Sequence, residues 1–314
     1  MKHALKITAI LLMMFVLTQL IGLVTVNYYN QDGTQLPYGM DAPETSENIA
    51  GNMSLLFSLI ISFVIAIIIF FILMNIKSVW FMRGWFFIVV TLALGITINV
   101  VTSGFLDSTA AIILASSIAL ILAFFKIFQR NILIHNSTEL LIYPGIAAVF
   151  VPILNMWTLA ILLIIISIYD IWAVWHSGIM QKMAKFQMDK LRVFSGFFVP
   201  YASKTVRAKI KALKLKYKDS KEIPESVIKK KGIKVNLAIL GGGDVIFPII
   251  AAGVFLKTFE SISAALIVTL FATIALALLF VFAKKKKFYP AMPFISTGIF
   301  AGMLVAWLML KFVF

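Results

Sequence analysis

Residues 157–175, WTLAILLIIISIYDIWAVW, form a membrane-length apolar run with a single charged side chain, Asp170. Residues 237–250, LAILGGGDVIFPII, show the same pattern, and their single charged side chain is Asp244. A carboxylate at bilayer depth costs several kcal/mol, so it is rare unless it faces a protein interior or a water-filled cavity. Two such residues therefore indicate one shared functional site inside the membrane.

The composition is that of a membrane protein. Hydrophobic residues make up 61% of the 314 residues and charged residues 13%, and the mean hydropathy is +1.01. A soluble domain has about half of its residues apolar and about a quarter charged. In a membrane protein the location of the basic residues matters more than the net charge of +15. We therefore do not take this charge as a sign of nucleic-acid binding, and we expect no nucleic-acid partner.

The residue types exclude several kinds of catalytic site. The chain has no cysteine, which excludes disulfides, thiolate metal sites and cysteine nucleophiles. Its three histidines, His3, His135 and His176, lie apart near the predicted membrane edges and form no HExxH motif. We therefore expect no metal site and no cofactor.

Membrane-length apolar segments recur along the whole chain. A hydrocarbon core of about 30 Å needs about 20 helical residues. The sequence predicts an all-α membrane protein with nine transmembrane helices, at roughly 5–26, 53–74, 84–102, 108–125, 139–155, 157–175, 235–256, 262–283 and 289–313. Asn99, Asn155 and Ser167 are polar within or near these spans, and we expect them to form hydrogen bonds between helices.

The basic residues predict the orientation. If the N-terminus lies in the cytoplasm and the spans alternate, every Lys and Arg except Lys257 and Lys311 falls on the cytoplasmic side. We expect a multi-pass protein of the cell membrane with a cytoplasmic N-terminus and an extracellular C-terminus. A basic cytoplasmic loop, 176–234, divides the chain into a six-span block, 1–175, and a three-span block, 235–314.

The loop 176–234 allows two interpretations. It is either a solvated linker attracted to anionic lipid headgroups or a segment that becomes ordered when a partner binds. Within it, residues 194–201, FSGFFVPY, are apolar enough to lie at the membrane interface. The oligomeric state is left open.

The two aspartates are predicted to lie at similar depth. Asp170 lies about five residues from the cytoplasmic end of its span and Asp244 about nine residues into its own, or roughly 8 and 14 Å. Consecutive helices are usually neighbours, so the two carboxyls can face each other. Gly241–Gly243 weaken the helix beside Asp244 and allow another backbone to approach, and Pro248 follows one turn later.

Such a pair has a defined chemistry. Two carboxyls within hydrogen-bonding distance in a low dielectric share one proton and titrate as a coupled unit. The ionised member can take a proton from water while the protonated member polarises a carbonyl, without a metal, thiol or histidine. The alternative is a structural ion pair, but no Lys or Arg lies inside either span.

Three motifs resemble those of presenilins and signal peptide peptidases. They are a YD motif (Tyr169, Asp170), a GxGD motif (Leu240, Gly241, Gly242, Gly243, Asp244) and a PAL(P) motif (Pro290, Ala291, Met292, Pro293). Two positions depart from the pattern: Ile239 stands where presenilins have a lysine, and Met292 replaces the usual leucine. The motifs occur in the family's order on spans six, seven and nine.

The resemblance implies an intramembrane aspartyl protease with Asp170 and Asp244 as its catalytic pair. It would hydrolyse peptide bonds within transmembrane segments or signal-peptide remnants, with transmembrane proteins or peptides as substrates and lipid around it. The residues from Pro290 to Pro293 would form a non-helical stretch that helps to dock the substrate. The orientation resembles presenilins, and the short loops and absence of cysteine resemble an archaeal homologue.

Two other functions use the same features. A proton- or sodium-coupled transporter could use the aspartates as an ion relay, because broken helices and buried acids also mark transporters. We find no inverted repeat, however, and a transporter gives the proline motif no role. A membrane scaffold with a vestigial pair is the third interpretation.

Overall fold

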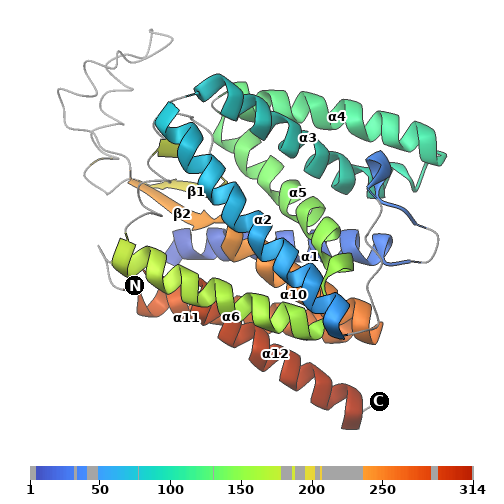
Figure 1. Cartoon of the computed structure of the whole chain (residues 1–314), viewed down its shortest axis with the longest axis vertical. Helices are drawn as coiled ribbons and strands as arrows, with labels where there is room; N and C mark the ends of the chain where they lie inside the picture. The colour runs from blue at the N-terminus through green and yellow to red at the C-terminus, as the bar shows by residue number, and fades with distance from the viewer. Residues whose placement is uncertain are drawn as a thin grey trace.

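The structure, a computed structural model, describes residues 5–31, 34–40, 49–76, 78–129, 131–177, 186–187, 195–201, 206, 236–283 and 289–312. Nine helices among these residues are long and apolar enough to cross a membrane, as the sequence predicted (Figure 1). They are α1 (Leu5–Tyr29), α2 (Ile49–Ile76), α3 (Val79–Thr102), α4 (Ser108–Phe128), α5 (Ile132–Phe150), α6 (Met156–Trp172), α10 (Gly242–Phe259), α11 (Ile262–Phe282) and α12 (Met292–Phe312).

Helix α10 lies at the centre of the bundle. It contacts α1, α5, α6, α11 and α12, and it is the most buried of the nine membrane-length helices. The pairs α3–α4 and α11–α12 pack along their lengths on opposite sides of it (Figure 1). Helix α1 begins and helix α12 ends on opposite sides of the view, as an odd number of spans requires (Figure 1).

Small residues allow the helices to approach closely. A β-carbon at Gly22 of α1 would overlap the side chain of Ile249 on α10, and one at Gly145 of α5 would overlap the carbonyl oxygen of Ala93 on α3. In lipid, helix association depends on such close van der Waals packing, since the hydrophobic effect no longer favours it.

The predicted span at 139–155 has different ends in the structure. Helix α5 begins at Ile132, because the Asn131 side chain accepts hydrogen bonds from the backbone N–H groups of Leu133 and Ile134. It ends at Phe150 and is followed by the short helix η2 (Val151–Ile153). The prediction excluded the polar residues before 139, but in the structure they have partners inside the protein.

Asn155 also differs from its predicted role. Its side chain caps α6 in a reciprocal capping box with Thr158, so it is not an interhelical donor. The other two predictions are confirmed. Ser167 of α6 donates to Ser296 Oγ of α12 at 3.0 Å, and Asn99 of α3 donates to Tyr29 Oη of α1 at 3.2 Å.

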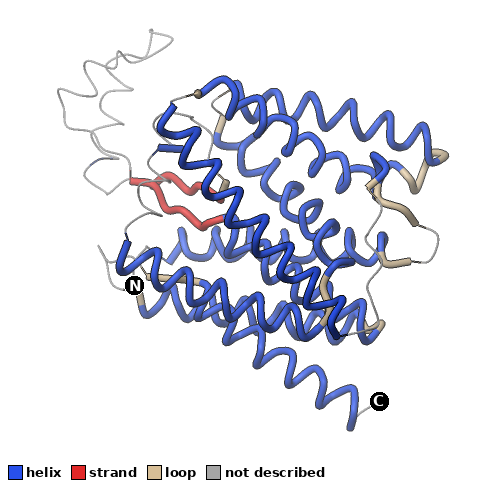
Figure 2. The backbone as a smooth tube through the Cα atoms, in the orientation of Figure 1, coloured by secondary structure: helices blue, strands red, loops and turns tan. Residues whose placement is uncertain are grey.

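The chain forms a short antiparallel sheet from a segment of the predicted loop and the predicted start of the seventh span. Strands β1 (Gly196–Tyr201) and β2 (Asn236–Gly241) pair with Gly196 opposite Gly241 and Tyr201 opposite Asn236 (Figure 2). The prediction that the seventh span begins at 235 is therefore wrong, because α10 begins at Gly242. Segment 194–201 was expected at the membrane interface, but β1 has the buried residues Phe197 and Val199 and packs against the bundle.

Most of the predicted basic loop lies outside the described residues. Its described parts are the end of the π-helical turn η3 (Ala173–Ser177), residues 186–187, 195–201 and 206. The strand β1 shows that part of the loop is an integral element of the fold.

Candidate active site

Asp170 lies two residues before the end of α6 and is buried, with 8% of its surface exposed. Its Oδ2 accepts a hydrogen bond from the backbone N–H of Met292 at 3.0 Å, and the N–H of Ala291 is a second donor to the carboxylate. Met292 is the first residue of α12. The positive end of that helix dipole therefore points at the carboxylate.

Asp244 lies in the first turn of α10, three residues after the N-cap residue Gly241. Its carboxylate accepts a hydrogen bond from the backbone of Gly241, which is one half of a capping box. The prediction placed it about nine residues into a helix. The difference arises because the preceding residues form β2, so the glycine triplet starts the helix.

The structure brings the two aspartates together. Helices α6 and α10 are in contact, and the carboxylates of Asp170 and Asp244 are close enough to interact electrostatically. The end of α6 thus meets the beginnings of α10 and α12 at one end of the bundle. Asp170 is buried and Asp244 is half-buried, so the pair is partly accessible from outside the protein through Asp244.

The glycine triplet has three different environments. A β-carbon at Gly242 would lie 2.5 Å from Ser195 Oγ and 3.0 Å from the Tyr143 ring, so only glycine fits there without a shift of its neighbours. At Gly241 it would lie 3.2 Å from Oδ2 of Asp244, whereas at the exposed Gly243 the nearest atom is 3.9 Å away. The triplet therefore allows α5 and Ser195, the residue before β1, to approach the first turn of α10 closely and leaves the side at Gly243 open.

The proline motif lies directly beside Asp170. Pro290 and Met292 are buried, and Ala291 and Pro293 are half-buried. Only Pro290 and Ala291 are non-helical, because α12 already begins at Met292, so the prediction of a non-helical stretch through Pro293 is wrong. A proline in the first turn costs no helix hydrogen bond, which allows the helix to start there.

The two remaining motif residues face different surroundings. Leu240 is buried in the core on β2. The Tyr169 side chain is 41% exposed, and its ring centroid lies 6.4 Å from that of Trp172 on the same helix. The structure gives Leu240 a packing role and leaves Tyr169 at the surface of α6.

Sequence reasoning missed the residues of α5, of β1 and just before β1 that lie beside the start of α10, near Asp244. Tyr143 is fully buried, its Oη lies 3.5 Å from Ser195 Oγ, and its ring meets that of Phe197 edge-on. The available signal was the polar run HNSTE, 135–139, within a helix that is otherwise apolar. Such residues in a span need partners inside the protein.

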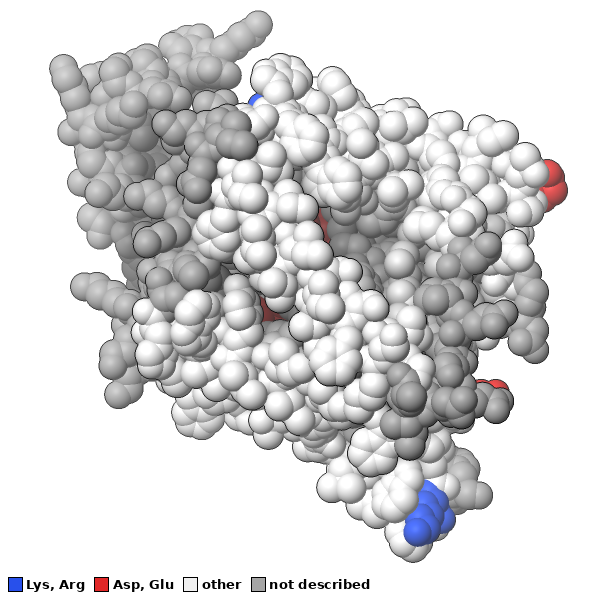
Figure 3. Space-filling model, viewed as in Figure 1, with Lys and Arg blue, Asp and Glu red and all other residues white. Residues whose placement is uncertain are grey.

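Most of the described surface in view is uncharged. Figure 3 shows acidic atoms in two hollows near the middle of this face and a few charged groups at its edge.

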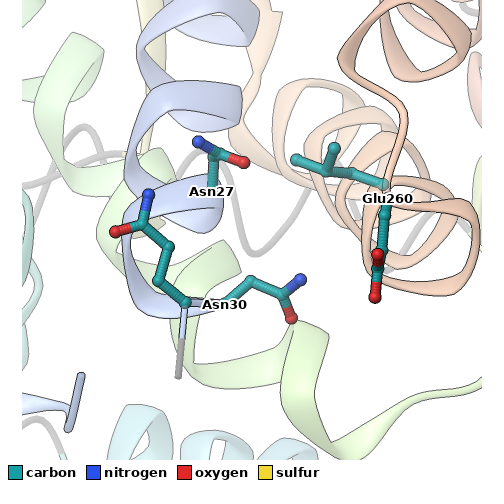
Figure 4. Close-up of a pocket in the computed structure, with 5 residues that line it drawn as sticks. Asn27, Asn30 and Glu260 are labelled. Carbon is teal, nitrogen blue, oxygen red and sulfur yellow. The ribbon is translucent and has the colours of Figure 1, made fainter. Parts of the chain in front are cut away.

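A cavity of about 290 Å³ is lined by Asn27, Asn30, Gln31, Leu256 and Glu260 (Figure 4). It lies at the opposite end of α10, roughly 20 Å along the helix axis from Asp244, and is separate from the aspartates. No group of three or more potential metal-ligating residues occurs within the described ranges.

Comparisons with known proteins identify the family. The sequence model of the family described as signal-peptide peptidase, presenilin aspartyl protease matches residues 12–312. No curated protein matches the chain. Solved structures with a similar fold include two of a presenilin family intramembrane aspartate protease. The one in space group C222 has a TM-score of 0.57 and 14% identity, covering 96% of this chain and 99% of its own.

The structure in space group P2 has a TM-score of 0.55 and 16% identity, and the match covers 95% of this chain and 96% of the other. At these identities the likeness shows the fold, and the family match extends over nearly the whole chain. Neither comparison supports the transporter interpretation. The chain belongs to the signal-peptide peptidase and presenilin family and is an intramembrane aspartic endopeptidase that acts on transmembrane-helix substrates.

Proposed function

We propose that Asp170 and Asp244 are the catalytic pair of this protease. The observation that carries the proposal is the meeting of two interacting carboxylates at the ends of α6 and α10, where backbone N–H groups are their donors. No Lys or Arg lies within 157–175 or 237–250. These segments therefore offer no basic side chain that could form an ion pair with either aspartate. Sharing one proton between the two carboxyls then lowers the electrostatic free energy of holding them close together.

The proposed mechanism needs only water and the two acids. The ionised carboxyl removes a proton from water, the water oxygen attacks the scissile carbonyl carbon, and the protonated carboxyl gives its proton to the carbonyl oxygen. The resulting gem-diol breaks its C–N bond as the leaving nitrogen receives a proton from the first carboxyl. A gem-diol hydroxyl returns a proton to the second, so the pair is restored and no covalent intermediate forms.

We propose that the substrate unwinds and adds to the free edge of β2. In β1, the carbonyl oxygen of Gly196 and both backbone groups of Phe198 bond to side chains of α5. The backbone N–H and C=O groups of these alternate residues of β1 therefore point away from β2. In the antiparallel register, the backbone groups of Leu237 and Ile239 must then point away from β1. The sheet has two strands among the described residues, and a third, extended strand from the substrate fits this edge.

The distribution of basic residues supports an orientation and a division of the chain. We propose that the aspartates lie toward the cytoplasmic face of the cell membrane, with the N-terminus inside, the C-terminus outside and lipid around the bundle. The six-span block 1–175 supplies Asp170. The three-span block 235–314 supplies Asp244 and the proline motif, and 176–234 is the basic connection between them.

Cleavage by aspartate variants tests the assignment. In liposomes with a panel of single-span peptides, Asp170→Asn and Asp244→Asn should each reduce cleavage below detection by mass spectrometry, because either change removes the shared-proton acid–base unit. Both should retain the wild-type melting temperature within a few degrees. Asp107→Asn is the matched control, since Asp107 is the N-cap residue of α4 and should leave cleavage unchanged.

Cleavage by either variant at a rate near that of the wild type would contradict the assignment. Transport of protons or sodium without proteolysis would instead support the ion-relay function. Loss of cleavage by Asp107→Asn would show that the assay responds to general damage.

A further inference from the structure

The first two turns of α5 carry polar side chains that lie within a membrane-length helix. His135, Asn136 and Glu139 belong to this segment, and Glu139 is almost completely buried. Polar groups inside a membrane protein need partners because no water is available to replace a missing bond. For His135 and Asn136 the partner is the strand β1.

Asn136 binds β1 as a neighbouring strand would. Its Nδ2 donates to the carbonyl oxygen of Phe198 at 2.8 Å, and its Oδ1 accepts from the N–H of Phe198 at 3.0 Å. One side-chain amide therefore satisfies both backbone groups of one residue. This bidentate contact fixes the height and the tilt of β1 against α5.

His135 adds two contacts to the same strand. Its Nε2 lies 2.8 Å from the carbonyl oxygen of Gly196, and its ring stacks on Phe198 with centroids 4.7 Å apart. The Nδ1 atom lies 3.3 Å from Lys126 Nζ. Because an ammonium group can only donate, Nδ1 accepts and Nε2 carries the proton that it donates to Gly196.

A buried ion pair holds the histidine in this orientation. Lys126 of α4 bonds to Glu139 of α5, and their side chains are 3% and 1% exposed. Lys126 thus contacts both Glu139 and His135, one turn apart on α5. Helix α4 thereby fixes the side of α5 that receives β1.

Strand β1 is linked to Asp244 through its pairing with β2. Gly196 is opposite Gly241 in the sheet, and Gly241 is both the last residue of β2 and the N-cap residue of α10. The backbone of Gly241 donates to the Asp244 carboxylate. The chain of contacts is therefore α5 to β1, β1 to β2, and the end of β2 to the carboxylate.

We propose that Asn136 and His135 are positioning residues for Asp244. They hold the edge of β1 that faces away from β2, and the β1–β2 pairing then sets where α10 begins and where Asp244 lies relative to Asp170. The inference rests on the proposed catalytic role of Asp244. It assigns to α5 a part in the reaction that no motif of the sequence indicates.

The variant Asn136→Ala tests the role. It removes both bonds to Phe198, and a displacement of a catalytic group by about 1 Å can cost 10²-fold in rate. We expect kcat for a single-span peptide in liposomes to fall about 10- to 100-fold. His135→Phe retains a ring to stack on Phe198 but loses the bond to Gly196, so its kcat should fall less.

Asn131→Ala is the matched control. Asn131 is also an asparagine at the start of α5, but its side chain caps the helix through Leu133 and Ile134. Its loss should lower the melting temperature and leave kcat unchanged. If Asn131→Ala lowers kcat as much as Asn136→Ala at an equal loss of melting temperature, the effect of Asn136 is only structural and the proposal is overturned.

The pH dependence of activity distinguishes a positioning role from a loss of stability, because a lower melting temperature alone does not change the width of the active pH range. Activity requires the singly protonated pair, and the pH range of that form is wide because the two carboxyls interact. If Asn136→Ala moves Asp244 away from Asp170, the active pH range should narrow, and it should not narrow in Asn131→Ala. An unchanged width together with a wild-type kcat would overturn the proposal.

The proposed function can fail separately. If Asp244→Asn still cleaves, the assignment of Asp244 is wrong and the positioning role is wrong with it. If Asp244→Asn is inactive while Asn136→Ala and His135→Phe have the wild-type kcat, only the positioning role is overturned. If Asn136→Ala does not fold, His135→Phe decides by the same two measurements.

Discussion

At the scale of single residues, one of the two donors to Asp170 is the backbone N–H of Met292, which only a proline substitution can remove. Met292 is 4% exposed, and its N–H bonds to the carboxylate at 3.0 Å. Met292→Leu retains both volume and donor, Met292→Ala retains the donor, and Met292→Pro loses it. A hydrogen bond to a charged group contributes about 1.5–3 kcal/mol, so Met292→Pro should have at least a roughly tenfold lower kcat than Met292→Ala.

Proline is compatible with the first position of a helix, so α12 can still begin at residue 292 in that variant. Met292→Leu should cleave within a few-fold of the wild type, because the swap conserves volume. Cleavage rates and melting temperatures of the three variants check this. Equal kcat values for the proline and alanine variants would show that the hydrogen bond to Asp170 has no effect on catalysis.

The sequence alone was enough to single out the two aspartates as a candidate site, but not the residues that the structure places around them. A charge inside an apolar span is costly wherever it lies, so Asp170 and Asp244 stand out without any knowledge of the fold. Tyr143 and Asn136 do not, because an aromatic ring or an amide near a helix end has many ordinary uses. Their proximity to the pair depends on β1, which is far away in the sequence.

At the scale of elements, the ion pair between Lys126 and Glu139 joins α4 to α5 in the interior. Removing one partner of a buried pair leaves an uncompensated charge and costs about 3–5 kcal/mol. Glu139→Leu should therefore lower the free energy of unfolding by about that much. The double variant Lys126→Met with Glu139→Leu should recover most of the loss, since apolar residues of similar volume often replace such pairs without cost.

Denaturant titration of the purified protein in detergent measures both variants. The double-mutant cycle also separates the interaction from the separate effects of each side chain. A double variant as unstable as Glu139→Leu would contradict the prediction. It would show that packing, and not the unpaired charge, sets the cost.

The boundaries of elements were the part of the fold that the sequence predicted least well. Residues 236–241 are apolar, and periodicity cannot distinguish a short apolar strand from the first turns of a helix. What decides for a strand is the pairing with β1, about 40 residues earlier in the chain. Likewise, α5 extends back to Ile132 because Asn131 caps it. Its polar residues also have partners in the protein: His135 and Asn136 bond to β1, and Glu139 pairs with Lys126 of α4.

At the scale of the whole molecule, the length and the number of apolar segments were enough to predict the class of fold. Each segment must satisfy its own backbone hydrogen bonds in lipid, so nine long apolar segments predict nine helices. The sheet beside Asp244 is the exception that this rule allows, since it lies against the protein. The orientation across the membrane depends on the charges and remains a prediction.

The absence of native cysteine makes the orientation directly measurable, because one introduced cysteine is the only thiol in the chain. Gln35 lies in the connection after α1 and Gln129 directly after α4, and both side chains are exposed. With the basic residues on the cytoplasmic side, Gln35→Cys should react with a membrane-impermeant maleimide on intact cells. Gln129→Cys should react only after the membrane is permeabilised, and retained cleavage by both variants provides the control for folding. The reverse labelling pattern would contradict the predicted orientation and would place Asp170 and Asp244 toward the outer face.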